Sequence, residues 1–356
     1  MTAPPPLLAV ALDGAGRHPA AWREPGARPA ELFTARYWLE LIREAEAGGF
    51  DLVTLEDSFG APDAGRADRV HGRLDAVLTA SAVAPNTTRI GLVPTIIASH
   101  TEPFHLSKAI ATLDYTSHGR AGALVQISGD PAAAAHAGRR PADALSPAEL
   151  VEEGADYIEV VRRLWDSWED DAEIRDEATG RFADRDKLHY IDFSGRWFTV
   201  KGPSITPRPP QGRPPVFAPP ELAHAADVVL LPDWRAHRLA DFAGQHVFGD
   251  VVVFLDTTAS AAKDRLSRLD GFDGAAFEPG TPVFTGTPAE LAGLVTDWHA
   301  AGLTGIRLIP GALPHDLTAL ASEVLPLLRT GAAEGTLRDR LGLSRPASRY
   351  ATEGKS

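Results

Sequence analysis

Residues 89–128 read RIGLVPTIIASHTEPFHLSKAIATLDYTSHGRAGALVQIS. The stretch holds an apolar run at 89–95, a helical pattern at 103–117 that begins with proline, and a second apolar run at 121–128. Proline is favoured at the first position of a helix, and apolar runs separated by a helix are typical of buried parallel strands. We therefore predict a strand–helix–strand unit with the two strands side by side.

The same alternation extends in both directions. We expect eight strands, at residues 7–12, 51–55, 89–95, 121–128, 215–218, 227–231, 251–255 and 306–309. We expect helices at residues 36–48, 74–84, 103–117, 148–168, 259–269, 288–301 and 316–329. Eight such units in 356 residues predict an α/β fold of the (β/α)₈ TIM-barrel type. The rival is a doubly wound sheet, whose dinucleotide-binding form needs G-x-G-x-x-G after the first strand; Gly14-Ala15-Gly16 lacks the third glycine.

One insertion interrupts the alternation at about residues 169–214, after the fourth strand–helix unit. Its segment HYIDFSGRWFTVKG predicts a β-hairpin that turns at Ser194-Gly195. Residues 129–147 are expected to form a loop, and residues 233–248 receive no assignment. We divide the chain into a barrel at 1–330, insertion included, and an irregular tail at 331–356 that packs on or near the barrel.

Composition excludes several classes of protein. The net charge is −13 and no basic cluster is visible, so we expect no nucleic acid as a partner. The absence of cysteine excludes disulfides, thiolate metal sites and a cysteine nucleophile. No apolar run approaches the roughly 20 residues that span a bilayer, and the first residues lack a signal-peptide pattern. We expect a cytoplasmic protein without a membrane segment or a metal site.

Candidate site residues follow the predicted strands, because barrel enzymes place their active face at the carboxyl ends of the strands. Asp57 ends an apolar strand, where a carboxylate is costly unless it is solvated or paired; it either contacts a ligand or anchors a loop. His100 is the one candidate catalytic residue. Glu102 and His105 follow His100, but their spacing does not match the metal-binding pattern H-E-x-x-H.

Several segments resemble the nitrilotriacetate/dibenzothiophene-sulfone monooxygenase group of the bacterial luciferase-like flavin enzymes. They include residues 89–122, KLHYIDFSGRWFTVKGPSITPRPPQGRP at 187–214 and TLRDRLGLSRPASRYA at 336–351. The resemblance implies a (β/α)₈ barrel that uses reduced FMN, supplied by a separate NAD(P)H:flavin reductase, to activate O₂. It implies the oxygenation of a small organic substrate. By position, it also implies that Asp57, Thr95, Ser99 and Ser128 contact the flavin.

The chain departs from the group at the positions that contact the flavin phosphate. A histidine and a tyrosine of the relatives are replaced by Pro147 and Val151. The relatives' Ala-Gly-Ser after the fifth strand is replaced by Ala218 followed by Pro219, Pro220 and Glu221. A hydrogen bond to a charged group contributes about 1.5–3 kcal/mol, so the loss of two or three would weaken FMN binding by about 3–9 kcal/mol.

Two other functions stay open for this sequence. A degenerate homologue with weak or no flavin binding would act as a ligand-binding or partner-binding protein. A relative that uses the deazaflavin F420 would transfer hydride without O₂. The resemblance also leaves a homodimer open.

Overall fold

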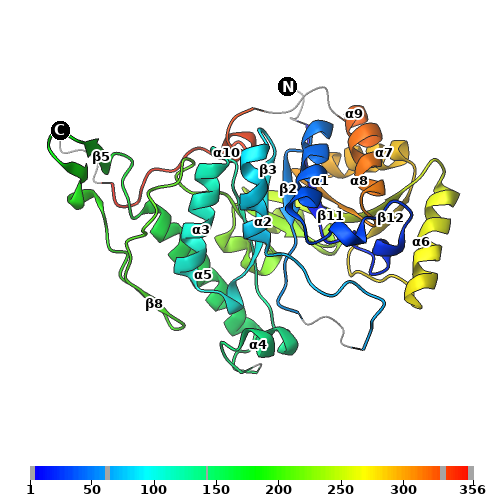
Figure 1. Ribbon diagram of the computed structural model, residues 1–356, viewed down its shortest axis with the longest axis horizontal. Coiled ribbons are helices and arrows are strands. Elements are labelled where there is room, and N and C mark those ends of the chain that lie inside the picture. Colours follow the sequence, from blue (N-terminus) through cyan, green and yellow to red (C-terminus); the bar gives the residue numbers. More distant parts are fainter. Residues whose placement is uncertain (1–4, 61–64, 142, 329–333, 352–356) are drawn as a thin grey trace.

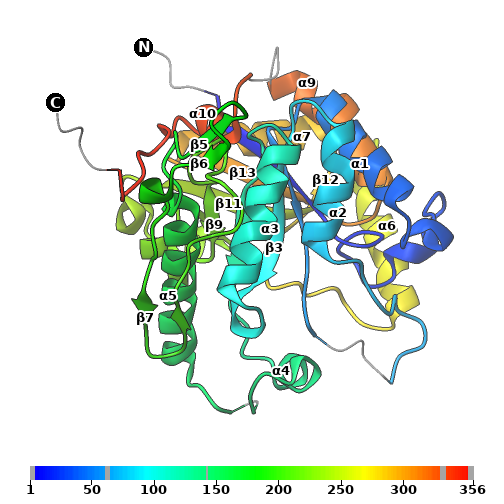
Figure 2. The same cartoon turned by 60° about the vertical axis from the view of Figure 1, so that its left-hand side comes forward.

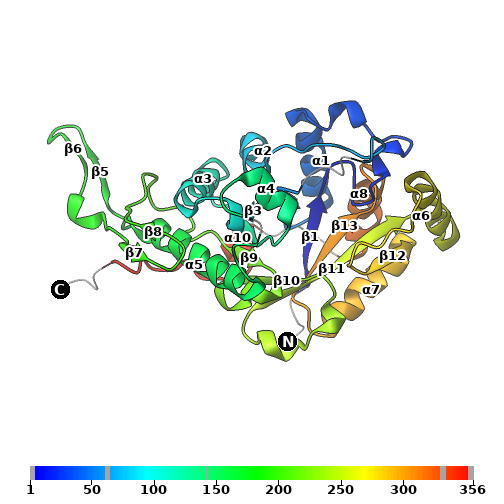
Figure 3. The ribbon, with the colours of Figure 1, turned by 90° about the horizontal axis from the view of Figure 1, so that it is seen from below.

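The computed structural model describes residues 5–60, 65–141, 143–328 and 334–351. Eight parallel strands close into a barrel in the order β1-β2-β3-β4-β9-β10-β11-β13, and β13 pairs with β1 (Figure 3). The barrel strands are β1 (Leu7–Leu12), β2 (Leu52–Leu55), β3 (Gly91–Ile97), β4 (Ala123–Gln126), β9 (Val216–Ala218), β10 (Val228–Leu231), β11 (His246–Leu255) and β13 (Gly305–Pro310). The predicted (β/α)₈ barrel is confirmed, and the open-sheet alternative is wrong.

Helices surround the barrel and cover its outer face (Figure 2). They are α1 (Ala35–Gly48), α2 (Ala76–Val83), α3 (Pro103–Thr116), α5 (Pro147–Asp166), α6 (Ala259–Asp273) and α7 (Pro288–Ala300). Two of them begin with a capping box, Ser146 with Glu149 at α5 and Thr287 with Glu290 at α7, and both have proline in the first turn. These local signals explain why the predicted helices lie within a few residues of the observed ones.

The barrel interior is built in layers, because alternate residues of each strand point inward. One layer is apolar and joins seven strands: Ala9, Leu52, Val93, Leu124, Phe217, Leu230 and Phe248. A second layer lies two residues further along each strand, toward the carboxyl ends, and faces the same interior. It is largely polar and contains Thr54, Thr95, Gln126, Asp250 and Arg307. The polar layer is the base on which the candidate site is built.

The insertion contains the hairpin of β7 (Phe193–Ser194) and β8 (Thr199–Val200), which confirms the predicted hairpin. Its turn spans residues 195–198 rather than Ser194-Gly195, because Ser194 still pairs with Thr199. Phe193 packs with Val160 and Leu164 of α5, so the hairpin lies against the outside of that helix. A second hairpin, β5 (Glu173–Asp176) and β6 (Arg181–Ala183), was not predicted. It projects away from the barrel at one end of the molecule (Figure 1).

The last helical stretch differs from the single helix predicted at 316–329. It is α8 (His315–Ala319), a π-helical turn η9 (Leu320–Val324) and α9 (Leu325–Leu328); residue 329 lies outside the described part. Pro326 explains the break, since proline has no N–H to donate and its ring displaces the carbonyl four residues back.

Other segments were also predicted wrongly. Residues 131–137, expected as loop, form α4 (Pro131–Ala137), capped by the Asp130 side chain. The seventh strand begins at His246, five residues early, and β12 (Val283–Gly286) extends the sheet beyond it. Residues 220–225, for which no element was predicted, form the 3₁₀ turn η6 (Pro220–Ala225) between β9 and β10.

The tail contains α10 (Leu337–Arg340), so it is not wholly irregular as predicted. The predicted boundary between barrel and tail, at 330/331, falls outside the described residues. Leu337 and Leu341 are buried in the apolar layer of the barrel. The Arg340 guanidinium donates to the carbonyl of Asp51, at the start of β2. Thus α10 lies at the amino ends of the strands, opposite α4 in Figure 1.

Candidate functional site

A cavity of about 450 Å³ opens at the carboxyl ends of the strands. Its size lies in the range of about 300–1,000 Å³ that is usual for small-molecule sites. Its lining is unusually rich in charge: Asp13, Arg17, Glu56, Asp57, Arg73, Asp250 and Arg307, with Gln126, Thr281 and others. We call it the mouth cavity.

A buried ion network forms the floor of the mouth cavity. Arg307 of β13 lies opposite Asp250 of β11, and its Nε and NH2 groups contact the two carboxylate oxygens at 2.9 and 2.5 Å. The NH1 group donates to Glu56 at 2.8 Å and to the Thr54 hydroxyl at 3.3 Å. Burial lowers the pKa of Arg307, but the two carboxylates outweigh burial and raise that pKa overall. The guanidinium stays charged, and the network links three barrel strands, β2, β11 and β13.

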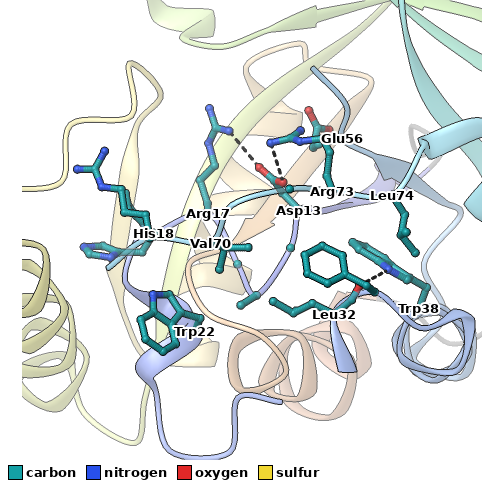
Figure 4. A pocket seen from close by; sticks show the side chains of 17 residues that line it. Asp13, Arg17, His18, Trp22, Leu32, Trp38, Glu56, Val70, Arg73 and Leu74 are labelled. Carbon is teal, nitrogen blue, oxygen red and sulfur yellow. Dashed lines mark hydrogen bonds and ion pairs between the residues drawn. The ribbon is translucent and has the colours of Figure 1, made fainter. Parts of the chain in front are cut away.

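At the rim of the mouth cavity, two guanidinium groups share one carboxylate. Asp13 Oδ2 lies 3.5 Å from Arg17, and Asp13 Oδ1 lies 3.7 Å from Arg73 (Figure 4). Burial raises the pKa of Asp13, and the arginines oppose this rise. The rim therefore carries cationic groups whose contacts with Asp13 are long.

The predicted flavin contacts lie on three adjacent strands: Thr95 within β3, and Asp57, Ser99 and Ser128 just after β2, β3 and β4. Asp57 lines the mouth cavity, but its oxygens accept from the backbone N–H groups of Ser58 and Ala76 at 2.7 and 2.9 Å, which anchors the start of α2. Burial raises the pKa of Asp57. Thr95 is buried in the polar layer, and its hydroxyl has no hydrogen-bond partner in the described part of the chain.

Ser99, His100 and Ser128 lie together, on the side of the mouth next to α5. The Ser99 hydroxyl accepts from the Ser128 backbone N–H at 2.9 Å. Both ring nitrogens of His100 are buried and have no partner among the described residues, and Phe59 contacts the ring edge-on. Burial and the nearby Arg140 and Arg139 lower the pKa of His100, which favours the neutral ring.

Sequence reasoning missed part of the site. Asp250, Glu56, Arg17 and Arg73 were not among the candidates. One signal for Asp250 was available, because a carboxylate inside an apolar strand requires a partner. The partner depends on the register between β11 and β13, which are not adjacent in sequence.

Comparison with known proteins settles the family. Residues 16–226, more than half of the chain, match the model of the luciferase-like monooxygenases. The chain belongs to this family. Nitrilotriacetate monooxygenase component A from Aminobacter aminovorans is 29% identical over 441 residues, covering 94% of this chain and 96% of that protein. The resemblance stated from the sequence is confirmed.

Two further matches cover most of the chain. One of the subunits of the pristinamycin IIA synthase from Streptomyces pristinaespiralis is 33% identical over 311 residues, covering 87% of this chain and 90% of that protein. The structure of the EDTA monooxygenase from Chelativorans sp. BNC1 superposes with a TM-score of 0.82 at 21% identity, covering 96% of this chain and 99% of that one. This likeness supports the fold.

The positions that resemble the family's phosphate contacts do not fit a phosphate here. Pro147 is the first residue of α5 and has no N–H, and Val151 packs against the core. Glu149 occupies the first turn of α5 and caps it, where it also contacts Arg196. After β9, Pro219 and Pro220 again lack N–H groups, and Glu221 adds a negative charge.

The arginines near these positions already pair with carboxylates of the protein. Glu153 of α5 is 1% exposed and contacts both Arg139, at 3.4 Å, and Arg140. Both guanidinium groups also donate to the Ser99 carbonyl, at 3.2 and 2.7 Å. The space between His100, Ser128 and Arg140 measures about 10 Å³, enough for about one water molecule but not for a phosphate.

Proposed function

We propose that this chain is a reduced-FMN-dependent monooxygenase that places the isoalloxazine ring of the flavin in the mouth cavity. The observation that carries the proposal is the mouth cavity itself, at the catalytic end of a barrel whose family consists of monooxygenases. A separate NAD(P)H:flavin reductase would supply the reduced flavin. O₂ and a small organic molecule would be the substrates.

Two residues of the mouth cavity and one of the polar layer carry polar groups suited to an isoalloxazine ring. Thr95 carries a buried hydroxyl that the described residues leave without a partner, and such groups usually have one in native proteins. Gln126 presents an amide in the mouth cavity, and Asp57 lies beside it. Bound reduced flavin would supply the activation of O₂, which amino-acid side chains do not provide. The side chains would bind and orient the ring and exclude water.

The phosphate of FMN has no matching site at the family positions, so we expect the ring to supply most of the affinity. Riboflavin, which lacks the phosphate, should then bind about as tightly as FMN. The test is a titration of the purified chain with FMN, reduced FMN, riboflavin and F420, followed by flavin fluorescence or absorbance. Failure of every flavin to bind at high micromolar concentration would overturn the proposal.

A second function is favoured by the same departures. The chain would be the flavin-poor member of a monooxygenase built from two different chains of the family. Pristinamycin IIA synthase supports this, since its subunits A and B are both similar to this chain. Pro147, Val151 and Pro219 would then be tolerated because the other chain holds the cofactor. To separate the two, the chain alone is supplied with reduced FMN from a flavin reductase. The second function predicts that the chain leaves the rate of flavin oxidation unchanged, whereas the monooxygenase function predicts a change.

A further inference from the structure

A second cavity, of about 200 Å³, lies beside the mouth cavity and shares part of its lining. The shared residues are Asp13, Arg17, Glu56 and Arg73. Its other walls come from the segment after β1, from the amino end of α1, and from residues 69–74 (Figure 4). We call it the side pocket. A ligand in the side pocket would reach the mouth cavity at the shared residues.

Away from these shared residues the side pocket is walled mainly by apolar side chains, with His18 and Arg69 as the polar exceptions. Trp22, Leu32, Phe33, Trp38, Val70 and Leu74 form its walls. Both indole N–H groups are already used, since Trp22 donates to the Asp68 carbonyl and Trp38 to the Leu32 carbonyl, each at 3.0 Å. The rings therefore offer apolar surface to a ligand.

Two walls of the side pocket are exposed apolar side chains. Phe33 is 52% exposed and Val70 is 37% exposed. Exposed apolar side chains that gather in one concavity mark a place where a ligand would gain by covering them.

Cationic groups stand at the junction of the two cavities. Arg17 and Arg73 each have side chains that are 40% exposed, and each pairs only with Asp13 among the described residues. In contrast, Arg69 forms two short hydrogen bonds to Asp273, at 3.0 and 2.8 Å. A guanidinium has five N–H donors, so Arg17 and Arg73 keep donors for an anion.

The carboxylates at the junction do not occupy all the N–H donors of Arg17 and Arg73. Glu56 is held by Arg307 at 2.8 Å and by the Thr54 hydroxyl at 3.1 Å. Among the described residues, Asp13 is the single carboxylate that pairs with both Arg17 and Arg73, and its contacts with them are long. A carboxylate or sulfonate placed between the two arginines would form charge-assisted, bidentate contacts that Asp13 does not.

We propose that the side pocket binds the apolar, aromatic part of an organic acid whose carboxylate or sulfonate lies between Arg17 and Arg73. A cavity of about 150 Å³ is known to hold benzene, so the side pocket suits a single ring with a short chain. That this acid is the substrate rests on the proposed function, because the mouth cavity is where oxygenation would take place. Binding of the acid itself does not depend on flavin.

The test is calorimetric titration of the flavin-free chain with 3-phenylpropionate and with the neutral 3-phenylpropan-1-ol. The acid should bind about tenfold tighter than the alcohol, since a hydrogen bond to a charged group is worth that much or more. Arg73→Gln should reduce this difference, since only Arg17 then remains to contact the anion. Phe33→Ser should weaken both ligands equally, because it removes only apolar surface.

The matched control is Arg36→Gln, which removes an arginine of α1 that is 80% exposed and lies outside the pocket. It should leave both affinities unchanged. Equal affinity for acid and alcohol, no binding of either, or an unchanged ratio in Arg73→Gln would overturn the proposal. A chain that binds the acid but no flavin would overturn the monooxygenase function and leave the side pocket in place.

Discussion

Thr95 puts a hydroxyl inside the barrel where the described part of the protein gives it no partner. Thr95→Val keeps the shape of the side chain and removes the hydroxyl, so the melting temperature should stay the same or rise. If the hydroxyl meets the flavin ring, the Kd for reduced FMN should rise about threefold to tenfold, the value of one hydrogen bond. Fluorescence titration and thermal unfolding measure the two effects.

The control for Thr95 is Thr54→Val in the same polar layer. The Thr54 hydroxyl contacts Glu56 at 3.1 Å and Arg307 at 3.3 Å, so its loss should lower the free energy of unfolding by about 1 kcal/mol. A Thr95→Val variant that loses stability but keeps its flavin affinity would assign Thr95 a structural role.

Glu153 is a buried carboxylate of α5 with two arginine partners. Glu153→Ala leaves Arg139 and Arg140 without their buried partner, and breaking such a pair costs about 3–5 kcal/mol of unfolding free energy. Glu152→Ala is the matched control, since Glu152 is 62% exposed and 3.6 Å from Arg196. Urea unfolding measures the free energy of unfolding of both variants. Equal losses in Glu153→Ala and Glu152→Ala would contradict this account.

Some site residues could be predicted from the sequence and others could not. Asp57, Ser99 and Ser128 could be placed near the mouth because each follows an apolar strand. Glu153 could not, because a glutamate in a helix is typical of a solvated face and its partners come from a loop. Asp250 needed the register of two strands that are far apart in sequence.

Among the elements, α10 connects the tail to the barrel. Leu337 is fully buried in the apolar layer, and the backbone N–H of Arg338 donates to the Gln211 side chain at 2.8 Å. Leu337→Ala should lower the free energy of unfolding by about 2–5 kcal/mol, because it leaves a cavity in the barrel. Leu327→Ala, at a side chain that is 60% exposed, should cost far less.

A loss of stability in Leu337→Ala no larger than in Leu327→Ala would show that the tail is not part of the barrel core. Chemical unfolding with two probes, tryptophan fluorescence and circular dichroism, measures this difference. Coincident transitions would justify reading both variants as changes in a single free energy of unfolding.

Elements with strong local signals were predictable, and short ones were not. The long helices α3 and α7, which begin with proline, lie close to their predicted bounds. The seven-residue α4 also begins with proline but is too short to show a periodic pattern. Strands β5, β6 and β12 have three or four residues each, too few for a periodic pattern. The signal for the π turn was present, since Pro326 stands inside the predicted helix.

In the whole molecule, the two ends of the barrel differ. The amino end is closed by α10 over an apolar layer, and the carboxyl end opens into the mouth cavity above a charged layer. Family membership and the barrel could be predicted, because segments along most of the chain carry the resemblance. The cavities could not, since segments 14–23, 69–74 and 279–281 meet there only through the fold.

Among the described residues, no helix is both long and apolar enough to cross a bilayer.

The central claim is that the chain keeps the cavity for a flavin ring but has lost the family's anchor for its phosphate. The most direct measurement is the ratio of the Kd values of riboflavin and FMN, each titrated into the same purified chain. We predict a ratio within about threefold of one, since the family's phosphate positions offer no charge-assisted hydrogen bond in this chain. A Kd for FMN more than about a hundredfold below that of riboflavin, the value of two such bonds, would contradict the account.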